Sequence, residues 1–279
     1  MSGACPALAG QVVAIDGKTV RGSHQRGERA IHLVSAYGSG LGTVPGQIRT
    51  ADKSNEITAI PELLDTLLLK GAIVTIDAMG CQQRIAQKIV DGEADYVLAV
   101  KGNQGALEGR VHRAFATLER WPDLYHGECD EHVEIDKDHG RIETRRCVAL
   151  SYTLCAQDTL YRWPKLRSVA MVEATREING AISTERRYYI SSLPPEATRI
   201  AHAVRSHWRI ENSMHWVLDM AFGEDQCRVR VGNAAQNFAI LRRIALNLFK
   251  RDTKTKAGLK NRRLKACASD RYRAEMLGW

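Results

Sequence analysis

Val12-Val13-Ala14-Ile15-Asp16 and Ala72-Ile73-Val74-Thr75-Ile76-Asp77 are two short apolar runs, and each ends in an aspartate. Apolar runs of this length predict buried strands. A carboxylate at the end of a buried strand is an unusual place for a charge, because an unpaired ion is costly to desolvate. One such aspartate alone is more often a turn residue. Two on neighbouring strands favour a shared cation, because they otherwise repel each other.

A third carboxylate, Glu211, lies far downstream in His207-Trp208-Arg209-Ile210-Glu211-Asn212-Ser213-Met214-His215-Trp216. Alone, it is typical of an exposed helix position. Its neighbours change that interpretation, since two tryptophans and two histidines at helical spacing are costly on a surface. The two histidines favour positioning the glutamate or contacting phosphate, with zinc ligation as the lesser alternative. Two strand aspartates and a helix glutamate are the ligands that a two-metal phosphoryl-transfer site requires.

The segments around the two aspartates predict an α/β fold. Three strands are followed by a helix, a strand, a helix, a strand and a helix, at residues 12–16, 31–37, 42–50, 54–68, 72–77, 82–90, 96–100 and 105–118. The first three strands form a meander, with Ser54 as N-cap of the first helix and Gly71 as its stop. This order is that of ribonuclease-H-like nucleases and recombinases, whose mixed sheet is flanked by helices. The carboxyl ends of strands one and four are expected at one edge, where ligands bind.

The remainder of the chain alternates less regularly. Residues 122–193 are β-rich, and we interpret them as an inserted antiparallel β subdomain before the last catalytic helix. A long helix is expected from Pro194 to Phe222, with Ile210, Met214, Val217 and Ala221 as its core stripe. Another amphipathic helix is expected over 233–249, with Phe238, Leu241, Ile244, Ala245 and Leu248 as its apolar residues. The predicted segments are an N-terminal remnant (1–11), the first part of the core (12–121), the insertion (122–193), the C-terminal core helices (194–249) and a basic tail (250–279).

The charge of the chain is concentrated at its end. The formal net charge is +8, with a pI near 9.2. Residues 250–279 hold ten lysines or arginines against three acids. Such a basic tail is typical of a polyanion contact, with nucleic acid the commonest partner. A solvated, partly disordered terminus accounts for the charge equally well.

The cysteines and the hydropathy of the chain indicate in which cellular compartment the protein acts. The seven cysteines are scattered without a Cys-x-x-Cys pair, which is against a zinc knuckle or a disulfide framework and favours reduced thiols. No apolar stretch approaches the roughly 20 residues of a membrane helix, and no basic segment precedes the small apolar residues at the N-terminus. We therefore expect a cytoplasmic, nucleoid-associated protein with no membrane partner.

Several polar side chains are candidates for DNA contact. The segment Asp138-His139-Gly140-Arg141-Ile142-Glu143-Thr144-Arg145-Arg146 is either a solvated hairpin or a grip on phosphate. Trp163 either stacks on an unpaired base or packs internally. The full set of candidate DNA-binding residues is Lys18, Arg21, Lys101, Asn103, His139, Arg141, Arg145, Arg205, His207, Asn212 and His215.

Six motifs together resemble the H-repeat-associated, ISAs-type insertion-sequence transposases of the DDE superfamily. They are Ile15-Asp16-Gly17-Lys18-Thr19-Val20-Arg21-Gly22-Ser23, Lys53-Ser54-Asn55-Glu56-Ile57, Thr75-Ile76-Asp77-Ala78-Met79-Gly80-Cys81-Gln82, Lys101-Gly102-Asn103-Gln104, His139-Gly140-Arg141-Ile142-Glu143-Thr144-Arg145, and the run from His207 to Asp219. The resemblance extends from about residue 10 to the C-terminus. It implies a bacterial Mg²⁺-dependent transposase with a ribonuclease-H-like core and a β insertion.

The resemblance also implies residue roles and partners. Asp16, Asp77 and Glu211 would form the catalytic and metal-binding triad, holding Mg²⁺ or Mn²⁺, with two ions expected. The partner is double-stranded DNA, both transposon ends and target, with no small-molecule substrate and a homo-oligomer when ends are paired. Family members carry a further N-terminal domain, and the related Tyr/Arg/Glu/Lys signature is replaced by Val204, His207 and Leu218 at its other three places.

Two alternatives remain at this stage. The chain could be an N-terminally truncated, transposase-derived DNA-binding protein without transposition activity. It could also be a host nuclease that uses the same fold and cuts DNA lacking terminal repeats.

Overall fold

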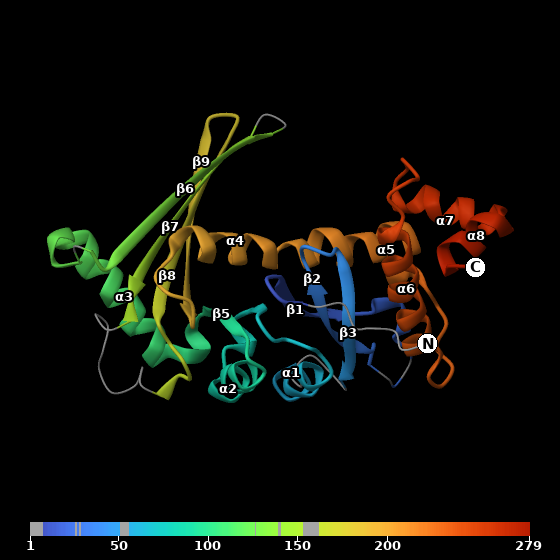
Figure 1. Ribbon diagram of the computed structural model, residues 1–279, viewed down its shortest axis with the longest axis horizontal. Coiled ribbons are helices and arrows are strands. Elements are labelled where there is room, and N and C mark those ends of the chain that lie inside the picture. The colour runs from blue at the N-terminus through green and yellow to red at the C-terminus, as the bar shows by residue number, and fades with distance from the viewer. Residues whose placement is uncertain are drawn as a thin grey trace. The chain divides into compact units, whose positions relative to one another are not determined.

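The computed structural model describes residues 8–25, 27, 29–50, 56–125, 127–138, 141–152 and 162–279 (Figure 1). The chain forms two compact units. The first, which we call the terminal unit, comprises residues 1–68 and 208–279. The second, the central unit, comprises residues 69–207. These units divide the chain differently from the five predicted segments, because the strand that precedes Asp77 falls in the same unit as the β-rich insertion.

The terminal unit begins with the predicted antiparallel meander. Its strands are β1 (Val12–Thr19), β2 (His32–Gly38) and β3 (Thr43–Thr50). Asp16 is paired with Ser35 in the β1–β2 ladder, and the pairing continues to Thr19 opposite His32. The prediction that the first strand ends at Asp16 is therefore wrong. Backbone pairing with β2 keeps the polar residues after Asp16 extended, although their side chains carry no apolar signal of a strand.

Helices complete the terminal unit, some packed on this meander and others on those helices. They are α1 (Glu56–Asp65), the π-helical turn η8 (Glu211–His215), α5 (Trp216–Phe222), α6 (Ala234–Arg251), α7 (Leu259–Ala268) and α8 (Asp270–Leu277), with short 3₁₀ turns η1 (Arg21–Ser23) and η9 (Glu224–Gln226). The predicted core stripe of Ile210, Met214, Val217 and Ala221 is confirmed, since all four side chains are buried together.

The first helix ends earlier than predicted. It stops at Asp65, and the Thr66 hydroxyl donates a 2.7 Å hydrogen bond to the Leu63 carbonyl oxygen. This side chain competes with the next backbone donor for a helical carbonyl, which explains the early end. Leu68, predicted to continue the apolar face, is exposed. The predicted N-cap, Ser54, lies outside the described residues.

The prediction of which residues form the buried face of α6 (Ala234–Arg251) is wrong. Phe238, Leu241 and Ile244 are 43%, 57% and 50% exposed. The buried face of α6 instead carries Ala235, Ala239, Arg243, Leu246 and Phe249. Two alanines let the helix pack closely against Val20, Ile31 and Leu33. The guanidinium of Arg243 is buried because it finds Glu224, 2.9 Å away, which a hydrophobic count does not anticipate.

The basic C-terminal segment is helical. Helices α7 and α8 pack on α5 and α6. The Arg262 guanidinium donates hydrogen bonds to carbonyl oxygens of Phe249, Asp252, Thr255 and Ala257 at the end of α6. The alternative of a disordered terminus is therefore wrong for the two helices, 259–268 and 270–277. Part of the positive charge caps a helix rather than facing solvent.

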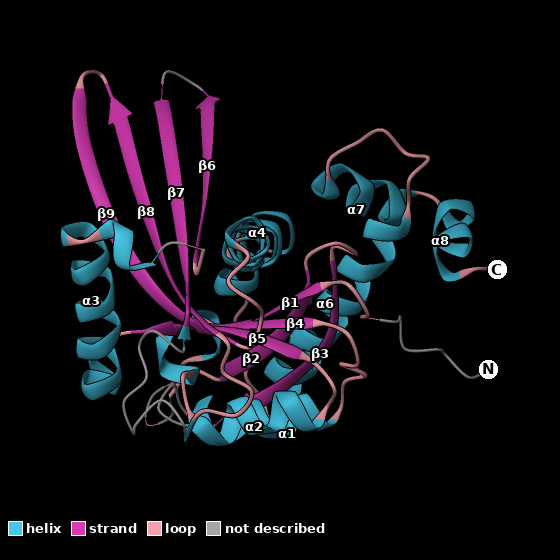
Figure 2. Cartoon of the chain, turned by 60° about the vertical axis from the view of Figure 1, so that its left-hand side comes forward, coloured by secondary structure: helices cyan, strands magenta, loops and turns pink. Residues whose placement is uncertain are grey.

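The central unit contains a mixed sheet in the order β4-β5-β9-β8-β7-β6. Its strands are β4 (Ile73–Ile76), β5 (Asp95–Val100), β6 (Cys129–Asp138), β7 (Arg141–Ser151), β8 (Ser168–Ile178) and β9 (Ala181–Ser191). The β4–β5 pair is parallel, and β9 pairs antiparallel with β5. Through β9, the four antiparallel strands of the β-rich segment continue the sheet, and these strands are long (Figure 2).

Three α-helices flank the sheet of the central unit. They are α2 (Gln83–Asp91), α3 (Gly105–Arg120) and α4 (Ala197–His207). Helix α2 packs on β5, α3 on β9, and α4 on the strands from β4 to β8. Short 3₁₀ turns follow β4, β5 and α3, namely η3 (Ala78–Gly80), η4 (Gly102–Gln104) and η5 (Pro122–Tyr125). The predicted α/β class, a mixed sheet flanked by helices, is thus confirmed. No helix within the described ranges is both long and apolar enough to cross a membrane.

We expect Gly17→Ala to destabilise the terminal unit. A Cβ at this position would lie under 3.0 Å from Glu56 Oε1 and His32 Nε2, which form a buried hydrogen bond of 2.6 Å. Relieving this overlap should cost about 1–3 kcal/mol of unfolding free energy. Urea unfolding measures the effect. The control is Gly38→Ala, whose Cβ would meet nothing nearer than 3.7 Å. Equal stability of the two variants would contradict the packing argument.

We also expect Asp252→Asn to loosen α7 and α8. The Tyr272 hydroxyl and the Thr255 backbone donate hydrogen bonds to the Asp252 carboxylate, and these hold its pKa well below the usual range. A lowered folded-state pKa contributes stability above the unfolded-state pKa of about 4, and this stability is lost as the pH falls further. Hydrogen exchange at pH 7 should accelerate over 259–277. Asp270→Asn, which alters an exposed carboxylate, should leave exchange unchanged outside its own turn.

Candidate active site

Three potential ligand side chains converge in the terminal unit. Asp16, Glu211 and His215 each offer one ligand atom, and these atoms lie within 4.8 Å of one another. Asp16 comes from the middle of β1, and the other two come from the two ends of the π-helical turn. His215 Nδ1 lies 3.6 Å from Asp16 Oδ2. Two of the three predicted carboxylates are therefore brought together across almost 200 residues of chain.

The π-helical turn presents Glu211 and His215 from the same segment. The backbone N–H of Trp216 donates to the Glu211 carbonyl oxygen, five residues earlier. Ile210 and Met214 are fully buried beside Tyr37, which holds the turn in place. Wide turns of this kind occur often at functional sites. The sequence predicted one regular helix through this region, because hydrophobic spacing does not distinguish a single π turn from α-helix.

The sequence left His215 open between positioning Glu211, zinc ligation and DNA contact, and the structure places it beside Asp16. The side chain is buried, with 8% of its surface exposed, so it has little room to meet a duplex directly. The four-residue spacing from Glu211 is the sequence signal for a partnership with that carboxylate, whereas the proximity to Asp16 has no local signal. The two carboxylate oxygens suit Mg²⁺ or Mn²⁺, and the imidazole nitrogen suits softer ions such as Zn²⁺.

Lys18 also forms ion pairs within the protein. It is 9% exposed, and its Nζ lies 2.8 Å from Asp219 Oδ2 and 3.5 Å from Asp225 Oδ1. These contacts oppose the predicted role of Lys18 in binding phosphate. Arg21, also a predicted DNA contact, is 83% exposed and remains accessible. Neither Asp219 nor Asp225 could be assigned to Lys18 from the sequence, because they lie some 200 positions away.

Asp77 lies in the central unit, directly after β4. Its side chain is exposed, and Oδ1 accepts hydrogen bonds from the backbone N–H groups of Met79 and Gly80 at 3.0 and 3.4 Å. It thus caps the 3₁₀ turn that follows the strand. The prediction that this strand stops at an aspartate is confirmed. This cap orients the carboxylate without burying it.

The motif Lys101-Gly102-Asn103-Gln104 braces the segment after Asp77. Asn103 Nδ2 donates a 2.6 Å hydrogen bond to the Ala78 carbonyl oxygen, and Gln104 Nε2 donates one of 2.9 Å to that of Cys81. Asn103 was predicted to contact DNA, and its amide instead supports this turn. Lys101 is exposed and makes no such internal contact among the interactions described.

His207 belongs to the central unit and is neutral at physiological pH. Burial lowers its pKa to about 4, although Asp77 acts in the opposite direction. Its Nδ1 lies 3.1 Å from the Thr75 hydroxyl on β4. A neutral, hydrogen-bonded imidazole does not provide the positive charge that the predicted phosphate contact would use.

The predicted DNA-binding arginines of the central unit have acidic neighbours. Arg145 lies 2.7 Å from both Asp136 and Glu143, and Arg205 lies 2.6 Å from Asp136. Arg141 is 3.4 Å from Glu143. These ion pairs hold the arginines along one surface, and their contact with DNA stays a prediction.

Three further residues were also candidates for DNA contact. His139 lies outside the described residues. Asn212 is exposed in the π-helical turn, beside Glu211. Trp163 is 5% exposed, so the packing interpretation is correct and base stacking is not.

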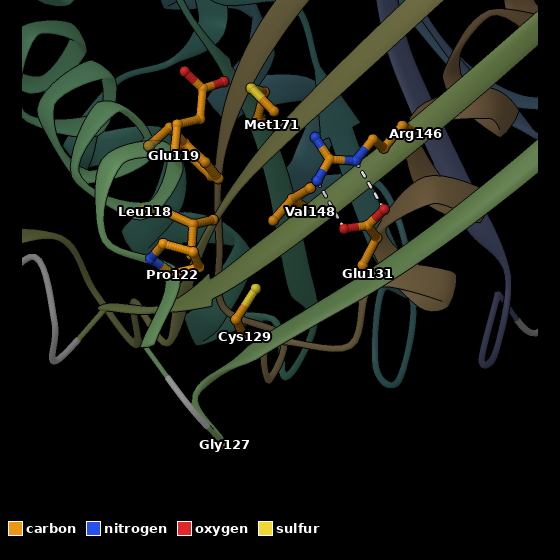
Figure 3. Close-up of a pocket in the computed structure, with 10 residues that line it drawn as sticks. Leu118, Glu119, Pro122, Gly127, Cys129, Glu131, Arg146, Val148 and Met171 are labelled. Atoms are coloured by element: carbon orange, nitrogen blue, oxygen red, sulfur yellow. Dashed lines mark hydrogen bonds and ion pairs between the residues drawn. The ribbon is translucent and has the colours of Figure 1, made fainter. Parts of the chain in front are cut away.

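A cavity of about 410 Å³ in the central unit lies apart from these predicted residues (Figure 3). It opens between α3 and the strands β6 to β8. Arg146 and Glu131 form a doubly hydrogen-bonded pair in it, with both bonds at 2.8 Å. Its apolar lining includes Phe115, Leu118, Pro122, Val148 and Met171. None of the predicted catalytic residues lines this cavity.

Comparison with known proteins identifies the family. The model of the transposase DDE domain matches residues 8–248. The chain is 46% identical over 277 residues to a protein named "Putative transposase YncI" from Escherichia coli O157:H7, covering 96% of this chain and 69% of that protein. It is 42% identical over 272 residues to "H repeat-associated putative transposase YhhI" from Escherichia coli K12, covering 95% and 71%.

A solved structure shares a looser similarity. It is a piggyBac transposase synaptic complex with hairpin DNA, with a TM-score of 0.46 and 9% identity, covering 96% of this chain and 52% of that one. The family assignment comes from the sequence comparisons, which span nearly the whole chain and include the β1 aspartate and the π-helical glutamate. The chain belongs to the DDE transposase family and is similar to its H-repeat-associated members.

Proposed function

We propose that this protein catalyses divalent-metal-dependent cleavage and strand transfer of double-stranded DNA at the ends of an insertion sequence. The observation that carries this proposal is the convergence of Asp16 and Glu211 within one ligand cluster. Asp77 completes the proposed triad, supported by the resemblance of Thr75-Ile76-Asp77-Ala78 to the family's motif. The protein acts on bacterial DNA in the cytoplasm, as a homo-oligomer when it pairs two ends.

The donor set fits a divalent cation. Two carboxylates and an imidazole lie close enough to share one ion, and their mutual repulsion is relieved by positive charge. Mg²⁺ or Mn²⁺ bound there, with two ions in the complete site, would supply Lewis acidity toward the phosphate and a lowered pKa for water. Asp16, Glu211 and His215 would hold one ion, and Asp77 would contribute to the pair.

The side chains around the cluster determine how it is presented. Glu211 is exposed, so its carboxylate is accessible to a large substrate. Trp208 and Trp216 flank it in sequence and are 42% and 60% exposed. Exposed indole rings beside a phosphate-processing site are suited to stacking on unpaired bases. We infer that these two rings contact DNA that has been opened at the cleavage site.

Basic side chains supply the attraction for the duplex. Arg21 and Lys101 are exposed, as are Lys254, Lys256 and Lys260 near the C-terminus. Lysine and arginine contacts with phosphates dominate the affinity of proteins for DNA and make it dependent on salt. The DNA affinity should therefore fall steeply between 50 and 200 mM salt.

We expect Asp16→Asn, Asp77→Asn and Glu211→Gln each to abolish DNA nicking. Loss of one electrostatic stabiliser costs roughly 10²–10³-fold in rate, and loss of a metal-binding carboxylate should cost at least as much. The assay is Mn²⁺- or Mg²⁺-dependent nicking of a duplex that carries the element's own ends. Glu62→Gln, at an exposed position of α1, is the control and should cut normally.

The same assay distinguishes the other interpretations. Retained cleavage by a folded triad variant would refute the assignment of that residue. DNA binding by the wild type without any cutting would support the transposase-derived DNA-binding protein. Cleavage of DNA that lacks the terminal repeats would instead support a host nuclease.

We expect Mn²⁺ bound to the protein to show magnetic coupling to an imidazole nitrogen. The nitrogen belongs to His215, so His215→Gln should remove the coupling and weaken Mn²⁺ binding about 10- to 100-fold, the range for groups that tune a metal site. Electron spin-echo modulation measures this signal. His202→Gln, on the exposed side of α4, should preserve the coupling. Coupling that survives in His215→Gln would show that His215 is not a ligand.

A further inference from the structure

Strand β1 and the helical segment that bears Glu211 are joined by two polar contacts in succession. His215 Nδ1 lies 3.6 Å from Asp16 Oδ2, and Lys18 Nζ lies 2.8 Å from Asp219 Oδ2. The two strand residues are two positions apart and therefore point to the same face of the sheet. The two helix residues are four positions apart and lie one above the other. Strand and helix thus run side by side with their contacts in the same order.

The spacing of these contacts matches on both elements. Two residues of strand span about 6.6 Å. Four residues of α-helix span about 6 Å. A helix that slid by one turn would move about 5.4 Å and would place either Asp219 or Glu211 against Asp16. The first shift would bring two carboxylates together and take Asp219 away from Lys18, and the second would place His215 against Lys18, so only the observed register keeps both contacts.

The second contact belongs to a larger charge network in the terminal unit. Lys18 also approaches Asp225, and Asp225 Oδ1 accepts a 3.2 Å hydrogen bond from the Arg21 backbone N–H. Nearby, Glu224 is fully buried and lies 2.9 Å from Arg243. These groups connect β1, α5, η9 and α6. The Lys18 ion pair therefore ties the helix to the strand at the point next to the ligand cluster.

The Lys18–Asp219 pair is partly buried, with the two side chains 9% and 32% exposed, so desolvation of the charges offsets much of their attraction. The best-supported use of buried ion pairs is to select one register among several. We propose that Lys18 and Asp219 are positioning residues for the metal site, which they serve by setting the register of the Glu211-bearing helix against Asp16. This inference rests on the proposed function, because it assigns the register to the use of Asp16 and Glu211 as ligands.

The test replaces the whole ion pair by apolar residues of similar size. Lys18→Met with Asp219→Leu removes both charges, so neither is left buried alone, and Asp225 keeps its contact with Arg21. We expect the thermal unfolding midpoint to change by only a few degrees. The Mn²⁺ dissociation constant should rise about 10- to 100-fold, and kcat for nicking should fall by a similar factor. The DNA dissociation constant should change less than about twofold.

The matched control removes another ion pair of the same unit. Arg271 and Glu275 form an exposed pair of 3.1 Å on α8, and Arg271→Met with Glu275→Leu should leave Mn²⁺ affinity and kcat unchanged. If the Lys18/Asp219 double variant does not fold, Asp219→Asn keeps the side-chain shape and one acceptor. It should still weaken Mn²⁺ binding about 3- to 10-fold.

The outcomes distinguish the positioning role of Lys18 and Asp219 from the proposed function. A folded double variant, or Asp219→Asn, with wild-type Mn²⁺ affinity and kcat would overturn the positioning role alone. Wild-type protein that neither binds Mn²⁺ nor nicks DNA would overturn the proposed function and this inference with it. Loss of stability with no change in metal affinity would mean that the pair serves only the fold.

Discussion

Polar side chains on a largely buried strand must find partners, and the second half of β1 carries three of them. Asp16 meets His215, Lys18 meets Asp219, and the Thr19 hydroxyl lies 2.8 Å from His32 Nδ1. Each partner comes from a different part of the chain. The need to satisfy β1 therefore brings the second strand, the π-helical turn and α5 to one place, and the ligand cluster is one product of that assembly.

Two glycines let these partners come close. A Cβ at Gly17 would overlap the buried pair of His32 and Glu56, and one at Gly22 would lie under 3.0 Å from the Cys227 carbonyl oxygen. The Gly22 carbonyl oxygen accepts a 2.9 Å hydrogen bond from Arg230. The segment from Ile15 to Ser23 is thus a continuous series of contacts, and its residue types follow from the neighbours that pack on it.

Much of the fold was predictable because it depends on local patterns. The meander, the parallel strands around α2 and the long antiparallel strands all follow from apolar runs and turn residues. The failures have a common cause. The face of α6 is decided by Arg243 and its buried partner Glu224, and the end of α1 by the Thr66 hydroxyl. These side chains form specific polar contacts, which apolar periodicity does not register.

The strand–helix order, the family resemblance and the choice of Asp16, Asp77 and Glu211 as acids of interest could all be read from the residues alone. This was possible because residue types and short spacings carry that information. The folded chain was needed to show that His215 lies with Asp16 and Glu211, that Lys18 pairs with Asp219, and that Asn103 supports the turn after Asp77. The physical reason is that polar groups are satisfied by partners that become neighbours only when the chain folds.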